Sequence, residues 1–167
     1  TPFLVTSTDM ADLLTTKYHR LQQRNTVHQG FFRIEAYELQ RIADQESLTR
    51  YVVQRPDATV ILLYNQDEDC FYLVKQLRAP ALQREPDPYL LELPAGVLEP
   101  GEEAEQTIVR EAREETGFAI PQPQFVKAFY ASPGTFSEKI HAYYSTVTNE
   151  MRVEAGGGLA TEAEDIE

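Results

Sequence analysis

A stretch of 23 residues, from Gly96 to Phe118, constrains this chain more than any other. Its first part, residues 96–101, holds two glycines and a proline, which are typical turn residues. Apolar side chains then recur at every fourth position, at Ala104, Ile108 and Ala112. That spacing predicts a helix with one apolar stripe, and Gly117 follows where a helix commonly ends in a left-handed residue. The stretch therefore predicts a turn-rich loop leading into an amphipathic helix.

Three carboxylates lie on another side of this predicted helix. Glu111 and Glu115 are four residues apart, so they share one face, and Glu114 flanks that face. Like charges at this spacing weaken an isolated helix by a few tenths of a kcal/mol. Hard oxygen ligands of this kind suit Mg²⁺ or Mn²⁺. From spacing alone, a solvated acidic face with Arg110 and Arg113 as local partners is an equal alternative.

The whole stretch resembles the Nudix hydrolase motif, a 23-residue pattern of fixed glycine, glutamate and arginine positions. The matching residues are Gly96, Glu102, Arg110, Glu111, Ala112, Glu114, Glu115, Gly117 and Phe118. Ala and Phe at the aliphatic positions are a mild departure that leaves the carboxylate pattern intact. The resemblance implies an α/β/α sandwich with a mixed central sheet, and metal-assisted hydrolysis of a nucleoside diphosphate linked to another moiety.

The resemblance also implies roles for individual residues. Glu111, Glu114 and Glu115 become ligands of Mg²⁺, with Mn²⁺ as an alternative, and Glu115 is central to catalysis. In related enzymes the carbonyl just before the motif glycine is a further metal ligand, and that position is Ala95. An ion pair between Arg110 and Glu102 is expected to hold the loop onto the helix.

Composition limits the other classes of function. The net charge of −12 argues against a nucleic-acid binder, which needs a basic surface along the phosphates. No apolar run has the length of a membrane span, and the first residues lack a signal-peptide pattern. Cys70 is the single cysteine, which suits a reducing cytoplasm and excludes an internal disulfide. We therefore expect a cytoplasmic enzyme without nucleic-acid or membrane partners.

Apolar patterning predicts two parts of the chain. Residues 1–56 are expected to form an N-terminal domain, with a small antiparallel sheet over residues 17–54. Residues 57–167 are expected to form the catalytic domain, with a second helical layer contributed by residues beyond Glu167. The strand predicted at 58–64 is expected to be buried on both faces and to form a hairpin with a strand at 71–77. Further strands are predicted at 89–93, 124–131 and 139–147. Residues 156–158, three consecutive glycines, predict the start of a flexible acidic end.

Further residues outside the motif are candidates for substrate binding. Arg78 ends a predicted strand and is able to hold a phosphate, although a solvated strand end is the alternative. Phe31 and Phe32 offer rings that stack on a base, although a core position is the commoner fate. Ser132 begins a turn-rich loop, and Glu138 at its end is expected to face the metals or a ribose, with packing of the hairpin as the alternative.

The motifs around the Nudix stretch resemble those of the ADP-ribose pyrophosphatase group. The shared features are Gly-Phe-Phe, Lys-Gln-Leu-Arg, Leu-Pro-Ala-Gly, the Ser-Pro-Gly loop with Pro133, and Gly-Gly-Gly-Leu followed by Glu-Asp-Ile-Glu. Pro133 is the feature linked to ADP-ribose, whereas the triple glycine is more similar to GDP-mannose and UDP-glucose hydrolases. The resemblance implies a homodimer that exchanges its N-terminal sheets. It also implies that a glutamate of the late loop is the general base. Glu164 is the first choice and Glu162 the second.

The predicted function is thus metal-dependent hydrolysis of a nucleotide sugar, with ADP-ribose giving AMP and ribose 5-phosphate. GDP-mannose and UDP-glucose remain alternative substrates within the same class. A non-catalytic domain that binds a nucleotide sugar as a regulator is an alternative of another class, although every motif carboxylate is present. mRNA decapping and cleaning of the nucleotide pool use the same motif, but the acidity of the chain and the Ser-Pro-Gly loop weigh against them.

Overall fold

The computed structural model describes residues 15–158 and residue 166. The chain divides into two compact units. One unit contains residues 1–55 together with 132–137, and the other contains residues 56–131 and 138–167. Within the described residues, no helix is long and apolar enough to cross a bilayer.

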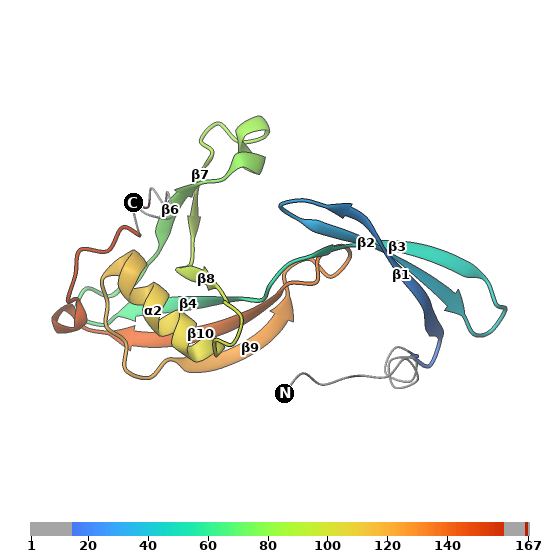
Figure 1. Ribbon diagram of the computed structural model, residues 1–167. Helices are drawn as coiled ribbons and strands as arrows, with labels where there is room; N and C mark the ends of the chain where they lie inside the picture. Colours follow the sequence, from blue (N-terminus) through green and yellow to red (C-terminus); the bar gives the residue numbers. More distant parts are fainter. Residues whose placement is uncertain (1–14, 159–165, 167) are drawn as a thin grey trace. The chain divides into compact units, whose positions relative to one another are not determined.

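The first unit is a three-stranded antiparallel sheet (Figure 1), as the sequence predicts. Its strands, in spatial order, are β1 (His19–Gln29), β2 (Arg33–Arg41) and β3 (Ser47–Gln54). The loop at residues 132–137 joins this sheet although it is distant in sequence. The N–H of Val53 donates to the carbonyl of Thr135 (2.8 Å), and the N–H of Ser137 donates to the carbonyl of Val53 (3.1 Å). The Ser-Pro-Gly loop is therefore fastened to the end of β3.

The second unit is built on a mixed five-stranded sheet, which confirms the predicted α/β class. Its strands are β4 (Ala58–Asn65), β5 (Cys70–Tyr72), β8 (Ala95–Val97), β9 (Gln124–Tyr130) and β10 (Lys139–Val147). The order is β5–β4–β10–β9, and β8 also pairs with β4. The β4–β10 pair is parallel and the other pairs are antiparallel. Because β8 pairs with β4, the first residues of the motif loop are fixed to the middle of the sheet.

Helix α2 (Ala104–Thr116) packs on one face of this sheet (Figure 1) and confirms the predicted motif helix. The core between them consists of Ile61, Leu63, Ile108, Ala112, Phe118, Ile120, Tyr143 and Val147. The prediction that 58–64 is buried on both faces is wrong, because burial alternates along β4. Successive side chains of a strand point to opposite faces. Among the described residues, α2 is the α-helix that covers this sheet, and it covers one face.

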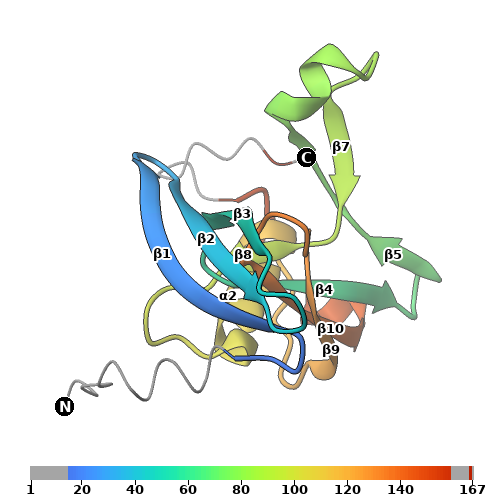
Figure 2. The ribbon, with the colours of Figure 1, turned by 90° about the vertical axis from the view of Figure 1, so that its right-hand side faces the viewer.

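The predicted strand over 71–77 breaks at Leu73. Its first half, β5, stays with β4, whereas β6 (Val74–Leu77) pairs with β7 (Tyr89–Glu92) in a separate two-stranded sheet. A short 3₁₀ helix, η1 (Ala79–Gln83), lies in the connection. Figure 2 shows this hairpin extending away from the five-stranded sheet. Because of the break, the two halves of one apolar stretch belong to two different sheets.

The triple glycine is bonded to the end of α2, which differs from the predicted flexible segment. A second 3₁₀ helix, η2 (Asn149–Met151), precedes it. The N–H of Gly157 donates to the carbonyl of Glu115 (2.8 Å), and the N–H of Gly158 donates to that of Glu114 (3.1 Å). All three glycines have positive φ, between 76° and 104°. Gly157 and Gly158 thus satisfy carbonyls that the end of a helix leaves without intrahelical partners.

Candidate active site

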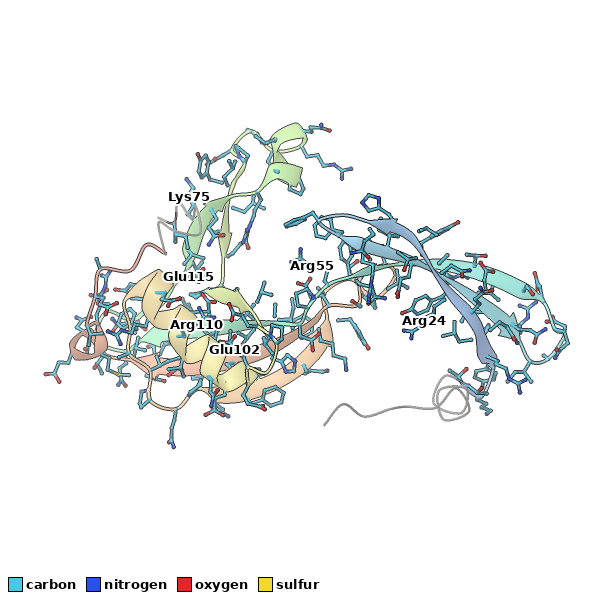
Figure 3. The ribbon with its side chains drawn as sticks, viewed as in Figure 1. Arg24, Arg55, Lys75, Glu102, Arg110 and Glu115 are labelled. Atoms are coloured by element: carbon cyan, nitrogen blue, oxygen red, sulfur yellow. The ribbon has the colours of Figure 1, made fainter. Side chains whose placement is uncertain are left out.

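The candidate site lies where the motif loop meets α2. Figure 3 shows Glu115 and Arg110 on α2, with Glu102 on the loop before the helix. Glu102 accepts hydrogen bonds from the N–H of Glu99 (3.0 Å) and the hydroxyl of Thr107 (3.1 Å). The bond from the Glu99 N–H is the main reason why the pKa of Glu102 lies below its ordinary value. Glu102 thus stays charged and ties the loop to the first turns of the helix.

Glu115 is the most enclosed carboxylate of the motif, with 5% of its surface exposed. One of its oxygens, Oε2, accepts the N–H of Ala95 in β8 (2.9 Å). The other, Oε1, accepts the side-chain amide of Gln76 in β6 (3.3 Å). Three elements therefore converge on one carboxylate, and each of its oxygens is oriented by a different strand.

Glu111 packs against the backbone of Gly96. A Cβ atom placed on Gly96 would lie 2.1 Å from Oε1 of Glu111, far inside van der Waals contact. A glycine is therefore required here for a steric reason, because the carboxylate occupies the space of a side chain. This contact brings the carboxylate against the loop residue that follows Ala95.

Arg110 balances the charge of the motif carboxylates. Its Nη1 lies 3.0 Å from Glu111 and 2.9 Å from Glu114, and its Nη2 lies 3.8 Å from Glu102. Burial by itself lowers the pKa of Arg110, but the three carboxylates outweigh it and raise the pKa above its ordinary value. The predicted ion pair with Glu102 is present, and Arg110 also orients two of the proposed metal ligands.

The donor chemistry of these residues fits a divalent cation. Glu111 and Glu115 supply hard carboxylate oxygens from one helix face, and both contact the 95–96 segment. In the part of the chain that the structure describes, no three acidic, His or Cys side chains are gathered as a complete metal cage. A backbone carbonyl and water molecules are common additional ligands of Mg²⁺, so a site with few side-chain ligands is chemically sufficient.

We expect Gly96→Ala to lower turnover at least tenfold, because the new methyl group displaces the carboxylate of Glu111 and disturbs a proposed metal ligand. Gly134→Ala is the matched control, since a Cβ there meets no atom within 4 Å. The measurement is the initial rate of nucleotide-sugar hydrolysis, with far-ultraviolet circular dichroism as a check of folding. A normal rate for Gly96→Ala would show that Glu111 is not needed in its observed position.

The structure places Glu111 and Glu115 against residues 95–96 and Glu114 beside Arg110. The predicted substrate residues lie in separate parts of the chain. Arg78 lies in the second unit, where Glu92 holds it through two hydrogen bonds, at Nε (2.6 Å) and Nη2 (2.8 Å). Glu138 also lies in the second unit, whereas Ser132 lies in the first. Glu162 and Glu164 lie outside the described residues.

Phe31 and Phe32 lie at the turn between β1 and β2 in the first unit. Phe31 is 94% exposed, so it is not a core residue. The two rings meet edge to face with their centroids 4.7 Å apart. The guanidinium of Arg55 lies 5.5 Å from the centroid of Phe32. This part of the first unit therefore combines a stacking surface with a positive charge.

Sequence reasoning missed Gln76 and Arg55. Gln76 lies within the Lys-Gln-Leu-Arg segment, where the sequence pattern points to Arg78 alone. Arg55 lies 23 residues from Phe32, and no regular spacing connects them. Gln76 of β6 meets Glu115 of α2, and Arg55 and Phe32 lie just outside strands β3 and β2. Each contact joins residues far apart in sequence, so a single-sequence pattern holds no signal for either.

The chain is similar to known proteins along most of its length. The NUDIX domain family matches residues 53–166. An ADP-ribose pyrophosphatase of Escherichia coli (strain K12) is 34% identical over 147 residues, which cover 86% of this chain and 70% of that protein. A GDP-mannose pyrophosphatase of Enterobacter sp. (strain 638) is 37% identical over 118 residues, covering 70% of this chain and 61% of that protein.

A solved structure, described as the crystal structure of an ADP compounds hydrolase, has a related fold. It superposes with a TM-score of 0.64 at 20% sequence identity and covers 79% of this chain and 69% of its own. At this identity the likeness concerns the fold. It supports the mixed sheet with α2 on one face as the framework that carries the carboxylates.

Proposed function

The chain belongs to the Nudix family, and from this premise we propose that it hydrolyses the diphosphate of a nucleoside diphosphate sugar. ADP-ribose is the proposed substrate, with AMP and ribose 5-phosphate as products. The observation that carries the proposal is the convergence of Glu111 and Glu115 on residues 95–96. The names of the similar proteins support a nucleotide sugar rather than a nucleoside triphosphate as the substrate.

Glu111, Glu115 and the carbonyl of Ala95 are the proposed holders of a divalent cation, with Glu114 nearby. We assign Mg²⁺ first and Mn²⁺ as its substitute, because the donors are hard oxygens. When bound, such an ion neutralises the diphosphate and lowers the pKa of a bound water. The protein orients the ligands. The N–H of Ala95 donates a hydrogen bond to Glu115, and Arg110 forms ion pairs with Glu111 and Glu114.

Glu164 is the proposed general base, with Glu162 as the second choice. Support comes from two described residues, Gly158 and Ile166. Gly158 donates to the carbonyl of Glu114 (3.1 Å), and Ile166 lines a cavity of about 410 Å³ that Glu115 also lines. Gly158 and Ile166 therefore lie beside the end of α2 that carries the proposed metal ligands. A base on this segment needs to accept one proton from the attacking water.

The residues proposed to bind the substrate are Arg78, Phe31, Phe32, Ser132 and Glu138. Arg78 is proposed to hold a phosphate, which a guanidinium binds well through charge-assisted hydrogen bonds. Phe31 or Phe32 is proposed to stack on the base, with Arg55 as a cationic neighbour. Ser132 and Glu138 are proposed to contact the ribose or the phosphates.

We further propose a homodimer that exchanges the three-stranded sheets and works in the cytoplasm. The exposed aromatic residues of the first unit, Tyr18, Phe31 and Tyr51, support a protein contact there. The single cysteine supports a reducing compartment. Analytical ultracentrifugation of the purified chain tests the dimer, and a monomer at micromolar concentration would contradict it.

A product assay tests the proposed activity. The purified protein is incubated with Mg²⁺ and, separately, with ADP-ribose, GDP-mannose, UDP-glucose and a nucleoside triphosphate, and the products are separated by chromatography. AMP from ADP-ribose, at a rate well above the other reactions, is the expected result. GMP or UMP as the main product would assign another nucleotide sugar. Binding without any product, with Mg²⁺ or Mn²⁺, would indicate a non-catalytic regulator.

We expect Arg78→Lys to raise the KM for ADP-ribose about tenfold, because a lysine loses the planar fork that holds both Glu92 and a phosphate. Arg84→Lys is the control, since Arg84 is exposed in the same β6–β7 connection. The measurement is the dependence of the initial rate on ADP-ribose concentration. An unchanged KM would remove Arg78 from the substrate site.

A further inference from the structure

Gln76 has no role in the proposed function, yet its side chain touches the most buried carboxylate of the site. Its Nε2 lies 3.3 Å from Oε1 of Glu115, although the two residues are 39 positions apart in sequence. This inference rests on the proposed function, because it assigns a partner to one of the proposed metal ligands. We propose that Gln76 is a positioning residue that holds the carboxylate of Glu115 in the orientation needed to bind the metal ion.

The strand β6 gives Gln76 a fixed place. Val74, two residues earlier on the same strand, is 2% exposed and therefore anchors β6 to the body of the second unit. Residues two apart on a strand point to the same side, so the anchoring of Val74 aims Gln76 inward as well. Gln76 is half-buried, whereas its neighbour Leu77, on the opposite side, is 48% exposed.

A glutamine is chemically suited to this position. A carboxylate that binds a metal must keep its negative charge, and a neutral amide donor orients it without neutralising it. A lysine at the same place would compete with the metal for that charge. Ala95 supplies the matching neutral donor to Oε2, at 2.9 Å. Hydrogen-bond partners of metal ligands fix the ligand's orientation and are worth about 10–100-fold in metal affinity.

A further contact restrains the main chain of Glu115. The backbone carbonyl of Glu115 accepts the N–H of Gly157, so the main chain is held on one side while Gln76 and Ala95 hold the carboxylate. The β6 strand also leads directly to Arg78, two residues after Gln76. One short strand thus connects the proposed metal ligand with the proposed phosphate ligand.

The test replaces Gln76 with Met, which has a similar volume but no N–H donor. Mn²⁺ binding is measured directly, by electron paramagnetic resonance of free Mn²⁺, and thermal unfolding is followed without metal. We expect Gln76→Met to weaken Mn²⁺ binding at least about tenfold and to leave the unfolding transition in place. Gln83→Met is the matched control, because Gln83 is exposed in the same β6–β7 connection.

A double-mutant cycle separates positioning from general damage. In the Glu115→Gln background, Gln76→Met is expected to change Mn²⁺ affinity less than about twofold, since the two residues act through one carboxylate. Equal losses in both backgrounds, or an Mn²⁺ affinity of Gln76→Met within about twofold of the wild type, would overturn the role of Gln76. A wild-type protein that neither binds Mn²⁺ nor hydrolyses any nucleotide sugar would instead overturn the proposed function, and this inference with it.

Discussion

Glu115→Gln is expected to lower kcat for ADP-ribose about a thousandfold, because it removes about 4 kcal/mol of metal-dependent transition-state stabilisation. Glu115 is buried, both of its carboxylate oxygens accept hydrogen bonds, and it lies one helical turn from Glu111. An amide of the same shape keeps the packing but offers the metal a neutral oxygen in place of a charged one. The loss should therefore appear in turnover rather than in folding.

The measurement is release of AMP at saturating Mg²⁺, with circular dichroism as a check that α2 is intact. Glu105→Gln is the matched control, since it makes the same change at an exposed position of the same helix. Activity above one-tenth of the wild-type value at saturating Mg²⁺ would contradict the metal assignment of Glu115.

Gly117→Ala is expected to lower the free energy of unfolding by about 2–4 kcal/mol. Gly117 has a φ of 80°, in the left-handed region where an L-residue with a Cβ costs about 1–2 kcal/mol. A Cβ atom there would also lie 2.1 Å from the backbone carbonyl oxygen of Glu154. That oxygen belongs to a segment bonded to the end of α2, so moving it breaks further hydrogen bonds. Both costs act on the folded state.

Gly101→Ala separates the two costs, because Gly101 has a φ of 93° but no atom within 4 Å of the place that the new methyl group would occupy. It should lose only the conformational part, about 1–2 kcal/mol. Urea unfolding of the two variants beside the wild type measures the difference. Equal losses would mean that residues 153–154 move away from the helix end at no cost.

The Gly117→Ala prediction depends on the hydrogen bonds that connect residues 153–158 with the carboxyl end of α2. Val153 donates to the carbonyl of Gly117 (2.9 Å), and Arg113 of α2 donates to Glu154 through its Nε (3.0 Å). Gly157 and Gly158 then satisfy the last carbonyls of the helix. A segment about forty residues further along the chain thus holds the carboxyl end of the helix that carries the proposed metal ligands. Its hydrogen bonds resemble those of a helix cap.

Several elements of the fold were predictable because their signals are local. The four-residue spacing of Ala104, Ile108 and Ala112 gave the helix, and Gly117 gave its end. Alternating or continuous apolar residues gave β9 and β10 nearly at their observed bounds. The motif gave Ala95, Glu111 and Glu115 as neighbours, which the structure brings together around residues 95–96.

Other features were not predictable because they depend on neighbours in space. The strand over 71–77 reads as continuous, yet it breaks at Leu73 because β5 pairs with β4 and β6 pairs with β7. The glycines at 156–158 read as a flexible segment, yet their N–H groups meet the carbonyls of α2. The break at Leu73 depends on which strand each half pairs with, and the glycine contacts join residues about forty positions apart.

The sequence by itself determined the helix, its cap and the identity of the proposed metal ligands, because periods of 3.6 and 2 residues and the motif spacing are properties of consecutive residues. The tertiary structure alone decided which groups hold those ligands in place. Gln76 meets Glu115 across 39 residues, and Ala95 meets it across 20. Such contacts arise only after the strands have paired and packed on the helix, and residue order alone does not encode the distance between two side chains.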